Sequence, residues 1–237
     1  MVAMIVYQKG VLKMKNIPVF TTDNGVASLV LEEIPTQGCA YIHIQSAMEP
    51  NKLLDECIGF CRMVGASRIY AKGHPVLEEF PFHTAIWEMR CARESLHDTD
   101  AALWPVQAET TETFRQIYNR KICLVPNAAW MSEKEAKRVA ACGEGYFIHR
   151  GNELLGIGMI AGREIRFVAS LAPGAGADVV CALAHGIFEE VIVLEVASKN
   201  QKAVKLYERL GFVRSREISK WYCVFEEMAP QALNTCI

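Results

Sequence analysis

The apolar and polar positions in the first part of the chain predict a β-α-β unit. Ala40 to Ser46 alternates as a strand does, and Glu49 to Val64 has the periodicity of a helix with Pro50 in its first turn. Gly65 ends this helix before a second strand, Arg68 to Ala71. Two strands in antiparallel order are expected to precede the unit, at Pro18 to Thr22 and at Ala27 to Glu32.

The same order of elements returns in the second part of the chain. Glu164 to Leu171 is a predicted strand, Gly174 to Phe188 a helix and Val191 to Val196 a strongly apolar strand. Antiparallel strands again come before the unit, at Gly145 to Arg150 and at Leu154 to Ala161. The pattern therefore predicts an α/β fold that contains two copies of one β-α-β unit.

Further elements are expected only in the second copy. Helices are predicted at Thr113 to Arg120 and at Glu133 to Cys142, the latter with the capping box Ser132-x-x-Glu135. A third helix, Lys199 to Leu210, has the capping-box pattern Ser198-x-x-Gln201 and stops at Gly211, and a final hairpin of Phe212 to Ile218 and Lys220 to Phe225 completes the sheet. The polar stretch His97 to Ala101 is the expected linker between the copies.

Composition and charge limit the class of protein. The 237 residues are 51% hydrophobic and 22% charged, which is typical of a globular protein that buries a core. Lys+Arg 25 against Asp+Glu 27 gives a net charge of −2, so no basic excess is present to neutralise a nucleic acid backbone. No run of eighteen apolar residues occurs, and the N-terminal pattern is not that of a signal peptide. The chain is expected to bind neither membrane nor nucleic acid.

Cysteine and histidine spacing points to a reducing compartment without a structural metal. The nine cysteines form no CxxC pair, and several lie on apolar helix faces, where a reduced thiol packs as a small hydrophobic group. The six histidines show no HxxxH or HxH spacing. These features predict a cytoplasmic protein with no metal site.

The loop Ala172 to Ala177 is the first candidate for chemistry. It contains Gly174 and Gly176 and leads from a strand into a helix, where free amides and the helix dipole favour a phosphate. An ordinary turn that needs glycine for its dihedral angles explains the loop as well. A dinucleotide-binding fingerprint is a further alternative, but Val179 replaces its third glycine and too few residues follow Glu195 for a second nucleotide-binding half.

The helix after Glu195 carries the more specific pattern. Asn200, Ala203, Leu206-Tyr207 and Gly211-Phe212 resemble the signature N-x-x-A-x-x-L-Y-x-x-x-G-F of the GNAT superfamily of N-acetyltransferases. In this alignment the glycine loop resembles the family's pyrophosphate loop, Q/R-x-x-G-x-G/A. The resemblance covers residues 102 to 225, with one departure: Leu171 stands where the family has Gln or Arg.

The resemblance implies a fold, a domain organisation and a cosubstrate. It implies the GNAT fold, a mixed and mostly antiparallel sheet with helices on both faces, with residues 99 to 237 as the acetyltransferase domain. Residues 1 to 98 would be a degenerate, GNAT-like half in tandem, because the junction Met48-Glu49-Pro50 has no glycine and places a carboxylate where phosphate would sit. Acetyl-CoA is the implied cosubstrate, and its implied binding residues are Val168, Ala169, Ser170, Gly174, Ala175, Gly176, Ala177 and Asn200.

Two residues are candidates for catalysis. Tyr207 shares the inward helix face with Ala203, Leu206 and Leu210, and the resemblance gives it the role of the acid that protonates the departing thiolate. A core tyrosine is the alternative. Glu195 ends an apolar strand, where a carboxylate needs a partner or a task, so it is either the base for the acceptor amine or a paired structural carboxylate. Asn200 would bind the pantetheine arm, cap its helix, or do both.

The predicted reaction is acetyl transfer to a primary amine by direct attack in a ternary complex. The amine, on a small molecule or a peptide, is expected to contact the segment Ile117 to Trp130 and the last hairpin, with Tyr118, Asn127 and Trp130 as candidates. A non-catalytic acyl-CoA sensor or scaffold is the alternative function, and a dinucleotide-dependent oxidoreductase is a third. Whether the protein forms a homodimer stays open.

Overall fold

The structure, a computed structural model, describes residues 3–5, 19–122 and 129–227 and forms two compact units. Of the described residues, unit 1 comprises 3–5, 84–122 and 129–218, and unit 2 comprises 19–83 and 219–227. The units therefore do not follow the expected boundary between residues 98 and 99. The reason is that two long strands, β6 (Phe82–Ala92) and β12 (Val213–Glu226), each contribute residues to both units. The expected linker at residues 97 to 101 lies inside unit 1.

Unit 2 confirms the first predicted β-α-β unit. Strands β2, β3 and β4 are antiparallel neighbours, β4 and β5 are parallel, and the C-terminal part of β12 pairs antiparallel with β5. One face of helix α2 packs on this sheet through Leu53, Leu54, Cys57 and Cys61. The elements are β2 (Val19–Thr22), β3 (Gly25–Val30), α1 (Ile34–Gln37), β4 (Cys39–Ala47), α2 (Pro50–Met63), β5 (Arg68–Lys72) and η1 (Pro75–Glu79).

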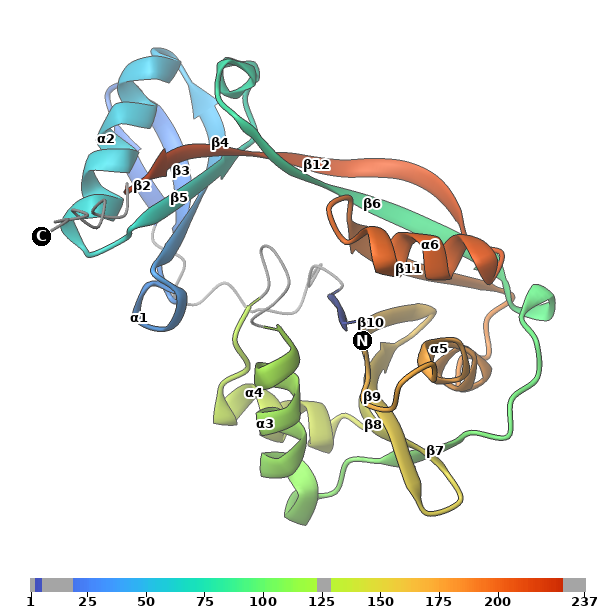
Figure 1. The fold of residues 1–237 in the computed structure, drawn as a ribbon. Helices are drawn as coiled ribbons and strands as arrows, with labels where there is room; N and C mark the ends of the chain where they lie inside the picture. The colour runs from blue at the N-terminus through green and yellow to red at the C-terminus, as the bar shows by residue number, and fades with distance from the viewer. Residues whose placement is uncertain (1–2, 6–18, 123–128, 228–237) are drawn as a thin grey trace, which may run out of the picture. The chain divides into compact units, whose positions relative to one another are not determined.

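Unit 1 contains the second β-α-β unit, also as predicted (Figure 1). Strands β7 to β10 are antiparallel neighbours in chain order, β10 and β11 are parallel, and β6 lies between β11 and β12. The elements are β1 (Ala3–Ile5), η2 (Arg93–Ser95), β7 (Ala102–Pro105), η3 (Ala108–Thr110), α3 (Thr111–Ile122), α4 (Glu133–Ala141), β8 (Gly145–Arg150), β9 (Glu153–Ala161), β10 (Glu164–Ser170), α5 (Gly176–His185), β11 (Val191–Ala197) and α6 (Gln201–Arg209).

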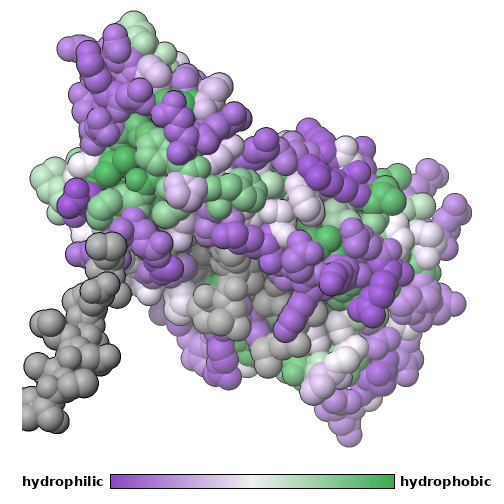
Figure 2. Space-filling model, turned by 45° about the horizontal axis from the view of Figure 1, so that its top comes forward, coloured by the Kyte–Doolittle hydropathy of each residue, from purple (hydrophilic) through white to green (hydrophobic). Residues whose placement is uncertain are grey.

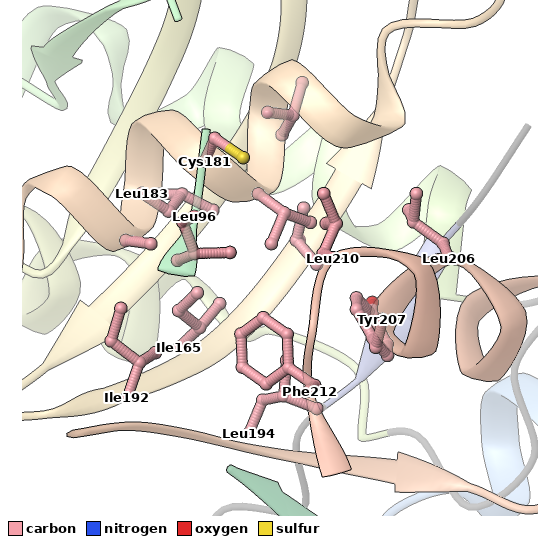
Figure 3. Close-up of a cluster of buried hydrophobic side chains, with 14 of the residues drawn as sticks. Leu96, Ile165, Cys181, Leu183, Ile192, Leu194, Leu206, Tyr207, Leu210 and Phe212 are labelled. Atoms are coloured by element: carbon pink, nitrogen blue, oxygen red, sulfur yellow. The ribbon is translucent and has the colours of Figure 1, made fainter. Parts of the chain in front are cut away.

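Helices cover both faces of the unit 1 sheet. On β10, Phe167 and Ala169 belong to the apolar cluster that includes residues of α3 and α4. Ile165 and Val168 belong instead to the cluster that includes residues of α5 and α6. The change of face between Ile165 and Phe167 coincides with an irregularity in the pairing of β10 with β9. Tyr207, Phe212 and Leu194 pack together in the second of these clusters (Figure 3).

Local signals predicted the ends of these five helices, α2 to α6, to within three residues. Ser132 caps α4, accepting a hydrogen bond from the Glu135 amide at 3.2 Å, as the capping box predicts. Helix α6 is capped by Asn200 rather than by Ser198, which the second capping-box pattern had favoured. The Ser198 hydroxyl instead accepts a hydrogen bond from the Ala85 amide at 2.9 Å and so joins β11 to β6. Helix α5 starts two residues later and ends three residues earlier than expected.

One prediction about strands was wrong, and one long strand was missed. The final hairpin is a single strand of 14 residues, β12, because Ile218, Ser219 and Lys220 include no Gly, Pro or Asn that would favour a turn. Strand β6, 11 residues long, was not predicted at all. Its two charged side chains, Glu88 and Arg90, interrupt the apolar pattern that would otherwise indicate a strand.

The face drawn in Figure 2 is largely hydrophilic, with apolar residues in smaller groups. Among the described residues, no helix has the length and hydropathy that a membrane crossing requires.

Candidate functional site

The glycine loop lies between β10 and α5, where predicted, and its shape comes from backbone hydrogen bonds. The Leu171 amide donates to the Leu155 carbonyl at 2.7 Å, and the Ser170 hydroxyl donates to the Ala172 carbonyl at 2.8 Å. Gly174 has a φ of +81°, a conformation that favours glycine, and no atom lies within 4 Å of the place where a Cβ would stand. The loop is therefore a fixed turn with open space beside Gly174.

The first turn of α5 can bind an anion. Its N-cap, Ala175, offers no side-chain acceptor, and the amides of Gly176, Ala177 and Asp178 have no acceptor within the helix. The carboxylate of Asp178 would oppose an anion, but it is held by Arg150 at 3.0 Å and by the Thr99 hydroxyl at 3.2 Å. This ion pair offsets the charge of the carboxylate next to the free amides.

Strands β10 and β11 separate beyond a short paired stretch. Parallel pairing is confined to Glu164 with Val193 and Ile165 with Leu194. Beyond this point Phe167 to Ala169 pair antiparallel with the backbone of β1, and β11 pairs with β6. Val168 and Ala169, two of the expected cofactor-binding residues, have fully buried side chains in the two apolar clusters. In this structure their side chains are buried and their backbone edge is paired with β1.

Helix α6 places Tyr207 in the core of unit 1. Its side chain is fully buried, and its ring contacts Phe212 edge-on at 5.9 Å between centroids (Figure 3). The hydroxyl has no hydrogen-bond partner among the described residues. Burial raises the pKa of this phenol well above its ordinary value, so the group is protonated at neutral pH. Asn200 acts as the N-cap, its side-chain oxygen accepting from the Ala203 amide at 3.3 Å.

Glu195 lies near the end of β11 and is only 3% exposed. Its neighbours Leu194 and Val196 belong to the cluster that contains Tyr207. Because side chains alternate along a strand, the Glu195 carboxylate points to the other face of the sheet. The two candidate catalytic residues therefore lie on consecutive elements, β11 and α6. Tyr207 packs against one face of the sheet, and the Glu195 carboxylate points to the other face.

Sequence reasoning missed Glu88, which lies directly opposite Glu195 in the antiparallel pairing of β6 with β11. Glu88 is 5% exposed and accepts hydrogen bonds from Arg216 at 2.7 Å, from Ser215 at 2.8 Å and from Arg90 at 2.8 Å. Burial alone would raise its pKa, but these three donors outweigh burial and lower the pKa to about 2. A signal existed in the sequence: Glu88 and Arg90 are the charged residues in an otherwise apolar stretch.

The expected acceptor residues are only partly testable. The Tyr118 ring packs on Phe167 at 4.4 Å, and its hydroxyl donates to the Ala129 carbonyl at 3.3 Å, which indicates a packing role. Asn127 lies outside the described residues, and Trp130 is 41% exposed. Trp221 and Tyr222, on the strand expected to form the last hairpin, belong to unit 2. In the part of the chain that the structure describes, no three His, Cys, Asp or Glu side chains form a group that could hold a metal ion.

Comparison with solved structures shows the class of fold. No protein-family model and no curated protein sequence matches the chain. The fold is similar to that of a functionally unknown conserved protein from Staphylococcus epidermidis, with 14% identity and a TM-score of 0.56 over 90% of this chain and 95% of the other. A GCN5-related N-acetyltransferase from Sphaerobacter thermophilus aligns with 9% identity and a TM-score of 0.52 over 86% and 78% of the two chains. Another, from Kribbella flavida, aligns with 14% identity and a TM-score of 0.51 over 88% and 90%. The chain thus has the mixed α/β fold found in GCN5-related N-acetyltransferases, the GNAT fold.

Proposed function

We propose that the protein is an N-acetyltransferase that transfers the acetyl group of acetyl-CoA to a primary amine within a ternary complex. The observation that carries this proposal is the Tyr207 hydroxyl, which is fully buried and has no hydrogen-bond partner among the described residues. A buried polar group without a partner destabilises the folded protein, so its presence calls for an explanation. A ligand that completes the hydrogen bond during the reaction provides one.

The residues of the loop and of α5 fit the phosphates of coenzyme A. The free amides of Gly176, Ala177 and Asp178 point out of the helix start, and Gly174 leaves space beside the loop. The position of Leu171, where the family has Gln or Arg, removes one polar contact but none of these amides. Binding would therefore rest on these backbone amides, with Ser170 and Asn200 as further proposed contacts, because β1 pairs with the edge of β10 at Val168 and Ala169.

The proposed roles of Tyr207 and Glu195 account for both protons that move during acetyl transfer. As the amine nitrogen attacks the thioester carbon, a C–N bond forms and the C–S bond breaks. Tyr207 donates its proton to the leaving sulfur, for which a protonated phenol is suited. Glu195 accepts the proton that the amine loses, directly or through a water molecule, and the acid and base are restored by exchange with solvent.

The protein is proposed to act in the cytoplasm.

Unit 2 is proposed to hold no coenzyme A. The strand-to-helix junction of unit 2 ends in Glu49 and Pro50: Glu49 brings a negative charge, and Pro50 removes one amide donor. The N-cap Glu49 makes no side-chain cap hydrogen bond, so its carboxylate is not neutralised by the helix amides. An incoming phosphate would meet this charge at the start of α2.

The experiment that tests the function is release of free thiol from acetyl-CoA in the presence of amino acids, polyamines, aminoglycosides and peptides with free N-termini. We expect release with at least one amine class, and loss of most of it in Tyr207→Phe. Binding of coenzyme A without release in any arm would identify an acyl-CoA sensor instead. Absence of both binding and release would refute the proposal.

A further inference from the structure

Glu195 belongs to an ionic cluster whose other residues have no role in the proposed reaction so far. We define the ionic cluster as Glu88, Arg90, Ser215, Arg216 and Glu195, contributed by β6, β12 and β11. Glu88 and Glu195 are direct cross-strand partners, and in an antiparallel pair such side chains have Cβ atoms about 4.5–5.5 Å apart. Both carboxyl groups are more than nine-tenths buried, so their charges act on each other with little screening by water.

Arg216 connects the two carboxyl groups electrostatically. Its guanidinium donates to one Glu88 oxygen from Nη2 at 2.7 Å and from Nε at 3.1 Å. The pKa of Arg216 is raised above its ordinary value, mainly by these bonds to Glu88 and in smaller part by the charge of Glu195. Arg216 is therefore anchored on Glu88 while it lies within electrostatic reach of Glu195.

Two further residues of the cluster bind Glu88. Arg90 on β6 donates to the second Glu88 oxygen at 2.8 Å, and Ser215 on β12 donates to that same oxygen at 2.8 Å. Glu88 thus stays ionised, with its two oxygens occupied, whatever the state of Glu195.

We propose that Glu88 is a positioning residue for the reaction: it holds Arg216 beside Glu195 and keeps a fixed negative charge opposite it, and so sets the pH at which Glu195 can accept a proton. This inference rests on the proposed function for its consequence in catalysis. The predicted effect of Glu88 and Arg216 on the titration of Glu195 can be tested in the free protein, without substrates. A structural salt bridge with no such role would leave the titration of Glu195 unchanged when either partner is removed.

Substitutions of Glu88 and of Arg216 are expected to shift the titration of Glu195 in opposite directions. In Glu88→Gln the negative charge opposite Glu195 is lost while the charge of Arg216 still acts on Glu195, so Glu195 becomes a weaker base and titrates at lower pH. In Arg216→Gln the cation is lost while Glu88 remains, so Glu195 titrates at higher pH. A charge at this separation shifts a neighbouring titration by about one pH unit or more.

The experiment measures the titration midpoint of Glu195 by carbon-13 NMR of labelled glutamate in the free protein, assigned with Glu195→Gln. We expect a midpoint at least half a unit below the parent in Glu88→Gln and at least half a unit above it in Arg216→Gln, with Arg216→Lys close to the parent. Glu112→Gln is the matched control, because Glu112 also has a pKa of about 2 beside an arginine but lies on α3. Unchanged midpoints, or shifts of the same sign in the Glu88 and Arg216 variants, would overturn the inference. If Glu88→Gln does not fold, the Arg216 variants still decide, since that side chain is 52% exposed.

The rate–pH profile then links the cluster to the reaction. The acidic limb of kcat/KM is expected to move to lower pH in Glu88→Gln and to higher pH in Arg216→Gln. In a Glu195→Gln background the two substitutions should no longer move it. Midpoints that shift as expected in a protein without transferase activity would uphold the electrostatic inference and refute the proposed function. If the protein is an active transferase but the acidic limb of its kcat/KM profile stays at the same pH in both variants, the proposed function is upheld and the positioning role is refuted.

Discussion

Replacement of Tyr207 by phenylalanine should make the protein more stable and less active. The substitution removes one hydroxyl and keeps the ring against Phe212. A buried hydroxyl without a partner costs about 1–3 kcal/mol, so its removal should raise the free energy of unfolding by about 1 kcal/mol or more. For a chain of this size that corresponds to a Tm higher by about 2–4 °C per kcal/mol.

The same substitution removes the proposed proton donor. General acid catalysis contributes about 10²- to 10⁴-fold, so turnover with a good acceptor should fall at least tenfold while affinity for coenzyme A barely changes. Tyr118→Phe provides the matched control for stability, because its hydroxyl donates to the Ala129 carbonyl and its loss should lower stability by about 1 kcal/mol.

Thermal melting, chemical denaturation and thiol release on the same samples measure all three quantities. A Tyr207→Phe protein that is less stable than the parent would show that the hydroxyl has a partner in the folded chain, and the reasoning from burial would fail. A variant that turns over like the parent would show that another group, or none, protonates the thiolate.

Three further predictions concern the loop, unit 2 and the ionic cluster. Gly176→Glu should abolish the thermal shift caused by coenzyme A, whereas Gly176→Gln, with equal bulk and no charge, should keep part of it; a full shift in the glutamate variant would contradict the loop assignment. Titration calorimetry should give one coenzyme A per chain, because Glu49 and Pro50 disfavour a phosphate in unit 2, and a stoichiometry of two would disprove this. Glu88 has its pKa lowered from 4.5 to about 2, so it should stabilise the fold above pH 4.5 and lose this contribution, about 3 kcal/mol, as pH falls toward 2. Urea denaturation of the parent should therefore show this loss and that of Glu88→Gln should not; equal pH dependence would argue against the ion pairs.

The two β-α-β units could be predicted because each depends on signals close together in the sequence. Alternating strands, a periodic helix and a glycine stop lie within thirty or so residues in both copies, and the parallel pairing of β4 with β5 and of β10 with β11 follows from that order. Strands β6 and β12 could not be placed in the same way. Their neighbours are distant in the chain, and β6 carries Glu88 and Arg90 inside its apolar pattern.

In the candidate site, too, local features could be predicted from the sequence, and features that depend on distant residues could not. The glycine loop and the position of Tyr207 on an inward helix face follow from local spacing. That no described residue bonds the Tyr207 hydroxyl depends on the packing of the whole core, and no local pattern encodes it. Glu88 becomes relevant only through the pairing of β6 with β11, which joins residues 88 and 195. Asn200 rather than Ser198 caps α6 because the Ser198 hydroxyl is already used between strands.

The division of β6 and β12 between the two units has a consequence for protein synthesis. A ribosome completes residues 19 to 83 long before the C-terminal part of β12, which is the antiparallel neighbour of β5 in unit 2. Throughout that interval the nascent β5 has only β4 beside it, and its other edge can pair with any extended segment, including one from another chain. Yield in a cell should therefore depend on chaperones that cover this edge. Chains shortened before residue 219 should accumulate as aggregates rather than as a folded half.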